Sequence, residues 1–206
     1  WGEEGLGAVY TLTNPETFEM VHVKAVSPNR EQPVLPSACD LWDIANFYER
    51  EVYDFYGVIF VNHPDLRRIF LREDWVGFPF RKDDKPEEKN EEIAVGDEPI
   101  SDLAPCYTLN ADGTLHCERT PLFADDDYVI NLGPQHPSTH GVLHFRTRID
   151  GEIITKIDPH LGYIHRSIEK ISEDLTYPQT LALTDRMDYL GAMQNRHALC
   201  ACVELA

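Results

Sequence analysis

The sequence predicts an α+β fold in which short strands and amphipathic helices flank a charged linker. Three observations lead to this prediction. Apolar and polar residues alternate from Val21 to Ala25, as they do in strands. Apolar residues recur at helical spacing from Leu41 to Phe55. A charged stretch without aromatic residues, Arg81 to Asp102, then separates this part from further strand-like and helix-like segments.

The first part, residues 1–81, is predicted to contain one main helix. Ser37 is expected to open it, with Asp40 three residues later as its capping-box partner. Gly57 is expected to end it, because glycine accepts the left-handed conformation of a helix terminus. Between these ends runs an apolar stripe at helical spacing, which predicts a helix packed on a core. The stripe consists of Leu41, Ile44, Ala45, Tyr48, Val52 and Phe55.

The second part, residues 82–120, is predicted to be a charged linker. Its first half is rich in acidic and basic residues and contains two prolines, so it cannot bury enough apolar area to order itself. Further on, Asp112-Gly113 lies between "CYTL" and "TLHC". This arrangement predicts a small hairpin within the same segment.

The third part, residues 121–206, is predicted to start with strands. "YVINL" is strand-like, and "VLHFRTRI" and "EIITKI" flank Asp150-Gly151. An Asp-Gly pair between two alternating segments is a strong hairpin signal, because both turn positions can take positive φ. In the first of these strands three apolar side chains alternate with three basic ones. The apolar set is Leu143, Phe145 and Ile149, and the basic set is His144, Arg146 and Arg148.

Two helices are predicted after this hairpin. Asp158 is expected to cap the first, with Pro159 in its first position, and the helix would run through "GYIHRSIEKISED". The second is expected to begin near Asp185 as its N-cap and to continue to the last residue, Ala206. A sequence that ends inside a helical pattern favours an internal piece of a longer protein. One face of the second helix would hold Tyr189, Met193, Arg196, Cys200 and Val203.

The composition limits the classes of function. The 206 residues carry a formal net charge of −18 with a pI near 4.7, so the surface repels polyanions and no nucleic-acid partner is expected. No apolar run reaches the roughly 18–20 residues that span a bilayer, so any membrane connection is expected to be peripheral. The cysteines are odd in number and scattered, which is typical of reduced thiols in a cytoplasmic protein. They are Cys39, Cys106, Cys117, Cys200 and Cys202.

The segment "NLGPQHPSTHG", residues 131–141, contains the most distinctive pattern. It places His136 and His140 four positions apart in a stretch stiffened by two prolines and bracketed by glycines. From residue types alone, the ordinary interpretation is a turn with exposed histidines. The functional interpretation is that a constrained imidazole, with an unperturbed pKa of about 6.5, exchanges protons near neutral pH.

Four segments of this sequence resemble subunits of respiratory NADH:quinone oxidoreductase, complex I. "ANFYEREVYDFYGVIFVNHPDLRRIF" resembles the signature of the C-type, 30-kilodalton-like subunit. "NLGPQHPSTHGVLHF", "DPHLGYIHRSIEK" and "DRMDYLGAMQN" resemble the N-terminal motifs of the D-type, 49-kilodalton-like subunit, which builds the quinone site in that family. Their order in one chain resembles the fused C/D subunit of some bacteria. The resemblance implies an internal piece that joins the end of the C-type part to the start of the D-type part.

This resemblance implies a domain plan. Residues 1–81 would be a small C-type α/β docking portion, and residues 82–120 the charged linker. Residues 121–206 would be the N-terminal portion of the D-type quinone-site subunit, with an antiparallel hairpin and the start of a helical domain.

The resemblance also implies a quinone site. In the family, the second histidine of the loop and the tyrosine of the R-x-D-Y motif sit at the quinone headgroup. They map onto His140 and Tyr189, which are therefore expected to be catalytic hydrogen-bond and proton donors. His136 is expected to support the site or to contact the quinone directly. Arg166 matches an arginine near the terminal iron–sulfur cluster, the alternative being a surface pair with Glu169 on one helix.

The partners and location follow from the same resemblance. The chain is expected to belong to the peripheral arm of a proton-pumping enzyme, on the cytoplasmic side of the bacterial inner membrane. Quinone would be the substrate, and the iron–sulfur cluster would lie in a partner subunit. No cofactor or metal is expected to bind this chain alone, which would be inactive by itself. Further expected partners are the other peripheral-arm subunits and the membrane subunits.

Two alternatives remain open. One is a C/D-type large subunit of a membrane-bound hydrogenase-like complex, because the D-type subunit resembles the large subunit of nickel–iron hydrogenases. A nickel–iron site needs paired cysteine thiolates, and "TDRMDYLGAMQN" holds none at the corresponding stretch, which argues against it. The other alternative is a scaffold or docking segment with no direct catalytic role.

Overall fold

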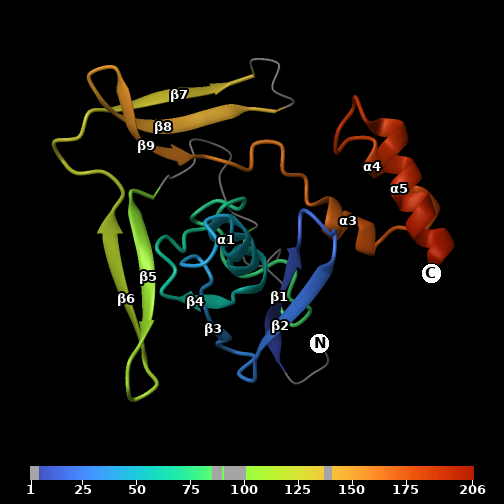
Figure 1. The fold of residues 1–206 in the computed structure, drawn as a ribbon, viewed down its shortest axis with the longest axis horizontal. Coiled ribbons are helices and arrows are strands. Elements are labelled where there is room, and N and C mark those ends of the chain that lie inside the picture. The colour runs from blue at the N-terminus through green and yellow to red at the C-terminus, as the bar shows by residue number, and fades with distance from the viewer. Residues whose placement is uncertain (1–4, 85–89, 91–100, 137–140) are drawn as a thin grey trace. The chain divides into compact units, whose positions relative to one another are not determined.

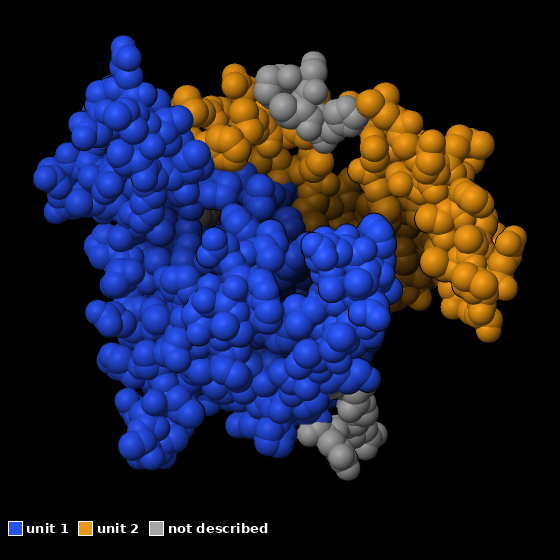
Figure 2. Space-filling model, in the orientation of Figure 1, with its two compact units in different colours: residues 1–130, 146–162 blue, residues 131–145, 163–206 orange. Residues whose placement is uncertain are grey.

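The computed structural model describes residues 5–84, 90, 101–136 and 141–206, and it confirms the α+β fold class. Figure 1 shows the helices and strands along the chain. The chain divides into two compact units, coloured separately in Figure 2. Unit 1 comprises Trp1–Ile130 and Arg146–Gly162, and unit 2 comprises residues 131–145 and 163–206. Each unit is described by itself below.

Unit 1 begins with an antiparallel hairpin of β1 (Leu6–Thr13) and β2 (Met20–Ser27). Its register runs from Leu6 opposite Ser27 to Thr13 opposite Met20. The strand predicted around residues 21–25 is therefore confirmed. Its alternation does not mark a buried face, however, since Val21 and Val23 are both exposed.

The main helix of unit 1, α1 (Ala45–Tyr56), ends as predicted and begins later than predicted. Gly57 follows it in the left-handed conformation with φ 74°, and its amide donates to the Tyr53 carbonyl oxygen. The prediction that Ser37 opens the helix is wrong, because the Ser37 hydroxyl donates to the Glu49 carboxylate at 2.6 Å instead.

The buried surface of α1 differs from the predicted apolar stripe. Ala45 and Phe55 are buried as predicted, whereas Leu41, Ile44 and Tyr48 are exposed. The helix buries charged side chains in their place. These buried charged residues are Glu49, Arg50 and Asp54. Arg50 donates to the carbonyl oxygens of Arg67 at 3.1 Å and Arg68 at 3.0 Å, and the contacts of the other two are described below.

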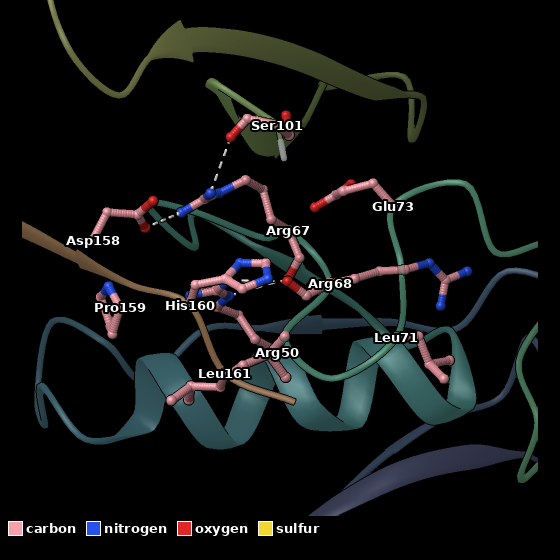
Figure 3. A pocket seen from close by; sticks show the side chains of 11 residues that line it. Arg50, Arg67, Arg68, Leu71, Glu73, Ser101, Asp158, Pro159, His160 and Leu161 are labelled. Carbon is pink, nitrogen blue, oxygen red and sulfur yellow. Dashed lines mark hydrogen bonds and ion pairs between the residues drawn. The ribbon is translucent and has the colours of Figure 1, made fainter. Parts of the chain in front are cut away.

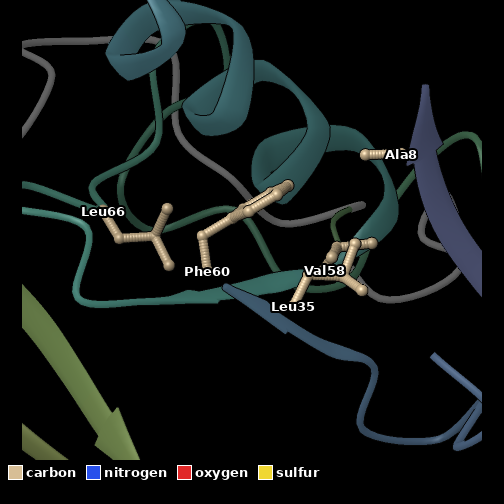
Figure 4. Close-up of a cluster of buried hydrophobic side chains, with 5 residues drawn as sticks. All are labelled: Ala8, Leu35, Val58, Phe60 and Leu66. Atoms are coloured by element: carbon tan, nitrogen blue, oxygen red, sulfur yellow. The ribbon is translucent and has the colours of Figure 1, made fainter. Parts of the chain in front are cut away.

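A four-stranded sheet packs against α1. It has the order β3 (Val34–Pro36), β4 (Ile59–Val61), β5 (Leu103–Leu109) and β6 (Leu115–Pro121). Parallel pairing joins β3 to β4 and β4 to β5, and β5 and β6 form an antiparallel hairpin. The apolar core lies beside these strands (Figure 4). It consists of Ala8, Leu35, Val58, Phe60 and Leu66.

The β5–β6 hairpin confirms the turn predicted at Asp112-Gly113, where Gly113 has φ 83°. This hairpin lies inside the segment 82–120, yet Val61 of β4 pairs with Tyr107 of β5. The second half of the charged segment is therefore part of a sheet. Residues 85–89 and 91–100, which make up most of the first half, lie outside the described residues.

The third sheet has the order β7 (Val129–Gln135), β8 (Leu143–Asp150) and β9 (Ile153–Pro159). It confirms the hairpin predicted at Asp150-Gly151, where Gly151 has φ 61°. Burial along β8 does not follow the predicted alternation: His144 and Arg146 of the basic set are buried, while Leu143, Phe145 and Ile149 are only partly covered. The prediction that Asp158-Pro159 begins a helix is wrong, because both residues belong to β9.

Three helices follow β9 where two were predicted, and the first and last of them are shorter than the predicted helices. They are α3 (Ile168–Glu173), α4 (Tyr177–Thr184) and α5 (Ala192–Leu205). Thr176 and Gln179 form a capping box that starts α4. Asp185 caps the C-terminus of α4 and does not begin the next helix, which starts only at Ala192. In the part of the chain that the structure describes, no helix combines the length and apolarity needed to cross a membrane.

Candidate functional site

Tyr189 lies in the turn between α4 and α5, where it is 59% exposed. The neighbouring carboxylate of Asp188 accepts a hydrogen bond from the Leu190 amide at 3.1 Å. The Asn195 side-chain amide donates to the Asp188 carbonyl at 3.3 Å and to the Thr184 carbonyl at 3.2 Å. These bonds fix the backbone on both sides of Tyr189. No motif or spacing in the sequence predicts this role of Asn195.

The stem of the histidine loop is closed by a glycine. Gly133 has φ 104°, and a Cβ atom there would lie 2.1 Å from the Leu143 carbonyl oxygen. Only glycine permits so close an approach of the two backbones. His136 follows β7 directly and is exposed. His140, the predicted catalytic histidine, lies outside the described residues.

The far end of the loop contacts the segment before α3. A Cβ atom on Gly141 would lie 3.1 Å from the Cδ1 atom of Ile164. Three residues further along the chain, Nδ1 of His144 lies 2.8 Å from the Tyr163 hydroxyl. His144 is 6% exposed and Tyr163 is 43% exposed. Arg166 lies three residues after Tyr163 in the chain and is exposed. It precedes α3, so it does not share a helix with Glu169, as the surface-pair alternative required.

Three of the four predicted site residues, His136, Arg166 and Tyr189, are described by the structure, and all three belong to unit 2. They come from a strand end, an irregular segment and an interhelical turn. All three residues are exposed in this chain.

Unit 1 contains a second concentration of polar side chains, the Asp158 cluster, which we define as Asp65, Arg67, Asp102, Arg146 and Asp158. Arg67 donates to both Asp65 oxygens and to Asp158 Oδ1, each at 2.7 Å. Arg146 donates to Asp158 Oδ2 through Nε at 3.0 Å and Nη2 at 2.7 Å, and it also pairs with Asp102. Asp158 is thus shared by two arginines that lie 79 residues apart in sequence (146 − 67 = 79).

The electrostatics of the cluster favour its charged form. Burial opposes ionisation of Asp158, but hydrogen bonds and charge from Arg67 and Arg146 outweigh burial and lower its pKa. Burial likewise opposes ionisation of Asp65, and Arg67 and Arg50 lower its pKa. Every charge in the cluster is paired, as buried charges must be.

A cavity of about 30 Å³ lies beside the Asp158 cluster (Figure 3). Its lining includes Arg50, Arg68, Glu73 and His160. A space of this size holds one or two water molecules and excludes a substrate. Because Asp65, Arg67, Arg146 and Asp158 are already paired with one another, we assign the cluster a structural role in unit 1.

Within the described residues, one group of side chains has the composition of a metal site. Potential ligand atoms of Cys39, Glu49 and His63 lie within 4.8 Å of one another. Glu49 and His63 are already committed to hydrogen bonds. The Glu49 carboxylate accepts from the Tyr10 hydroxyl at 3.0 Å, the Ser37 hydroxyl and the Ala38 amide at 2.8 Å.

His63 is occupied in the same way. Its Nδ1 accepts from the Asp65 amide at 3.0 Å, and its Nε2 donates to the Asn46 carbonyl at 3.1 Å. Burial raises the pKa of the Cys39 thiol to about 11, which disfavours the thiolate that a metal requires. The donor set thus fits a hydrogen-bond network that ties the segment before α1 to the helix, and it does not fit a metal.

The buried imidazole of His63 predicts a pH-dependent stability. Burial lowers its pKa below the ordinary value of about 6.5, so below that pH the unfolded chain binds more protons than the folded chain. The contribution of His63 is fully present above about pH 6.5 and is lost as pH falls towards the lowered pKa. We expect urea midpoints to fall between pH 7 and pH 5, and a His63→Gln variant to show a smaller slope. The exposed His116→Asn serves as control, and an equal slope in all three chains would contradict the prediction.

The cysteines do not form a cluster-binding set. Cys106 and Cys117 lie on the paired strands β5 and β6 of unit 1, and Cys200 and Cys202 lie two positions apart on α5 of unit 2. An iron–sulfur cluster is held by four converging ligands, commonly thiolates. Positions two apart on a helix differ by about 200° in direction, so this pair cannot converge.

Comparisons with known proteins agree with the motifs described above. Residues 1–90 match the family described as respiratory-chain NADH dehydrogenase, 30 Kd subunit. The chain is 56% identical over 202 residues to the C/D subunit of NADH-quinone oxidoreductase from Bacteroides thetaiotaomicron, an alignment that covers 98% of this chain and 38% of that protein. It is 57% identical to the C/D subunit from Phocaeicola vulgatus over 206 residues, which is all of this chain and 39% of the relative.

A more distant relative belongs to the same enzyme. The protein of Aquifex aeolicus named as a second C/D subunit of NADH-quinone oxidoreductase is 37% identical over 207 residues, covering 95% of this chain and 35% of the relative. The chain therefore belongs to the class of NADH-quinone oxidoreductase subunits. Within this class, the chain belongs to the family of fused C/D subunits, and it spans less than two fifths of the length of these curated relatives.

Proposed function

We propose that this chain acts in the peripheral arm of a proton-pumping NADH:quinone oxidoreductase, where unit 2 forms part of the quinone-reduction site next to the terminal iron–sulfur cluster. The single observation that carries the proposal is the composition of unit 2. This unit contains the stem of the histidine loop, the segment with Arg166 and the turn with Tyr189. The names of the relatives, all subunits of a quinone-reducing enzyme, support it.

In this proposal, the residues of the chain supply protons and charge. Quinone reduction consumes two electrons and two protons, so each carbonyl oxygen needs a nearby donor. His140 and Tyr189 donate hydrogen bonds and protons to the headgroup. His136 supports the loop, and Arg166 presents a positive charge towards the cluster, which a partner subunit holds.

Unit 1 acts as a docking module in the same proposal. Its two largest buried polar groupings, the Asp158 cluster and the Glu49 network, are committed to internal contacts. Other peripheral-arm and membrane subunits are the proposed partners, on the cytoplasmic side of the inner membrane.

Substitution of the two proposed donors in the complete assembled enzyme tests the site. We expect Tyr189→Phe and His140→Ala each to lower the rate of quinone reduction by about 100-fold or more, because lost acid–base catalysis typically costs about 100- to 10,000-fold. NADH oxidation with an artificial acceptor should stay unchanged. Controls are Tyr177→Phe and His197→Ala, which alter exposed residues of the same unit. Loss of assembly without a specific kinetic defect would instead favour the scaffold role.

A further inference from the structure

We propose that the hydrogen bond between His144 and Tyr163 is a positioning brace for the histidine loop. It fixes the strand that follows the loop against the segment that leads to Arg166. This inference rests on the function proposed above and extends it to two further residues, both in unit 2.

The contact lies at the point where the loop returns to the sheet. β8 begins at Leu143, two residues after Gly141, so the direction of its first residues sets the path of the returning chain. Two contacts hold this end to the same segment. Gly141 approaches Ile164, and Nδ1 of His144 lies 2.8 Å from the Tyr163 hydroxyl.

The interaction is a directional hydrogen bond and not general packing. The two ring centroids are 6.0 Å apart and the ring planes are tilted by 55°, so the rings do not stack. His144 is 6% exposed on β8, and a buried imidazole nitrogen needs a hydrogen-bond partner. The half-exposed phenol of Tyr163 supplies that partner from a segment 19 residues further along the chain.

A brace at this position matters because proton donors act only over short distances. Displacement of a donor by about 1 Å can cost about 100-fold in rate. Neither His144 nor Tyr163 is proposed to touch the quinone. Loss of the brace should therefore lower kcat and leave KM for quinone nearly unchanged.

The first experiment is Tyr163→Phe in the complete assembled enzyme, which removes one oxygen atom. We expect kcat for quinone reduction to fall about 10-fold, with KM within about twofold and NADH oxidation by an artificial acceptor unchanged. His144→Ala should have a similar effect. The double variant should be no worse than either single variant, because both remove the same contact. Tyr177→Phe removes a hydroxyl from an exposed tyrosine of the same unit and should behave as the wild type.

The possible results separate this inference from the proposed function. If Tyr189→Phe loses quinone reduction and Tyr163→Phe does not, the brace is refuted and the proposed site stands. If Tyr189→Phe and His140→Ala both keep full quinone reduction, the proposed site fails and the brace fails with it. Additive effects of Tyr163→Phe and His144→Ala would also overturn the brace.

A milder pair of variants decides the matter if Tyr163→Phe or His144→Ala prevents assembly. His144→Gln keeps a side-chain group that can bond the Tyr163 hydroxyl, whereas His144→Leu has similar bulk without that ability. We expect His144→Gln to keep at least half of the wild-type kcat and His144→Leu to lose about 10-fold. Equal losses in these two variants would refute the brace.

Discussion

Replacing Asp54 with alanine is expected to lower the free energy of unfolding by about 4 kcal/mol, because several buried donors lose their acceptor at once. Asp54 is fully buried on α1. Its Oδ1 accepts from Arg68 Nη1 at 2.8 Å, and its Oδ2 accepts from three consecutive amides, of Ile69 at 3.2 Å, Phe70 at 2.8 Å and Leu71 at 2.9 Å. One carboxylate thereby holds residues 68–71 against α1.

Asparagine is not expected to rescue this position. An amide replaces one carboxylate oxygen with an NH₂ group, which would face either the Arg68 guanidinium or the three backbone amides, all of them donors. Urea unfolding of the Asp54→Ala and Asp54→Asn chains measures the loss, and amide hydrogen exchange at residues 69–71 locates it. Asp40→Asn changes an exposed carboxylate before the same helix and should stay near the wild type. A loss below about 1 kcal/mol with these amides still protected would contradict the prediction.

Turns with local sequence signals could be predicted from the sequence. Asp112-Gly113 and Asp150-Gly151 both form hairpins, and Gly57 ends α1 in the left-handed conformation. In each case the information lies in adjacent residues, because glycine makes positive φ accessible without steric cost. The α+β class followed from these elements.

Elements decided by distant partners were predicted wrongly. Ser37 has the composition of a helix cap, yet its hydroxyl bonds Glu49 twelve residues away. Asp158-Pro159 has the composition of a helix start, yet Asp158 pairs with Arg67, 91 residues away, and remains in a strand. Local propensity is a weak term that tertiary contacts override. No local pattern reveals which distant arginine a carboxylate will meet.

The candidate site depended on the resemblance to a family more than on residue patterns. Spacing alone left His136 and His140 as exposed turn residues, and Tyr189 was expected on a helix. The structure puts Tyr189 in a turn that Asp188 and Asn195 hold, a role that no spacing rule assigns to Asn195. His140 stays a prediction, as it lies outside the described residues.

The Asp158 cluster connects parts of unit 1 that flank the charged segment, and its removal is the second large expected effect. Arg67 precedes that segment, whereas Asp158 and Arg146 follow it. Asp158→Ala leaves both guanidinium groups, whose side chains are 6% and 11% exposed, with only one carboxylate each. The remaining partners are Asp65 and Asp102. We expect the free energy of unfolding to fall by about 3 kcal/mol. This value is the lower end of the range of about 3–5 kcal/mol for removing one partner of a buried ion pair.

A surface pair provides the matched control for this loss. Asp74 bonds Arg72 through two nitrogens, as Asp158 bonds Arg146, but both members of that pair are more exposed. Asp74→Asn should therefore change the free energy of unfolding by less than about 1 kcal/mol. Since pairing lowers the pKa of Asp158 below its ordinary 3.8, its stabilisation is present above that pH and is lost as pH falls through the lowered pKa. The difference between wild type and Asp158→Ala in urea unfolding should accordingly be constant from pH 8 to pH 5 and shrink below about pH 4. A difference no larger than that of Asp74→Asn would show that the two sides of the charged segment are held together by packing and not by Asp158.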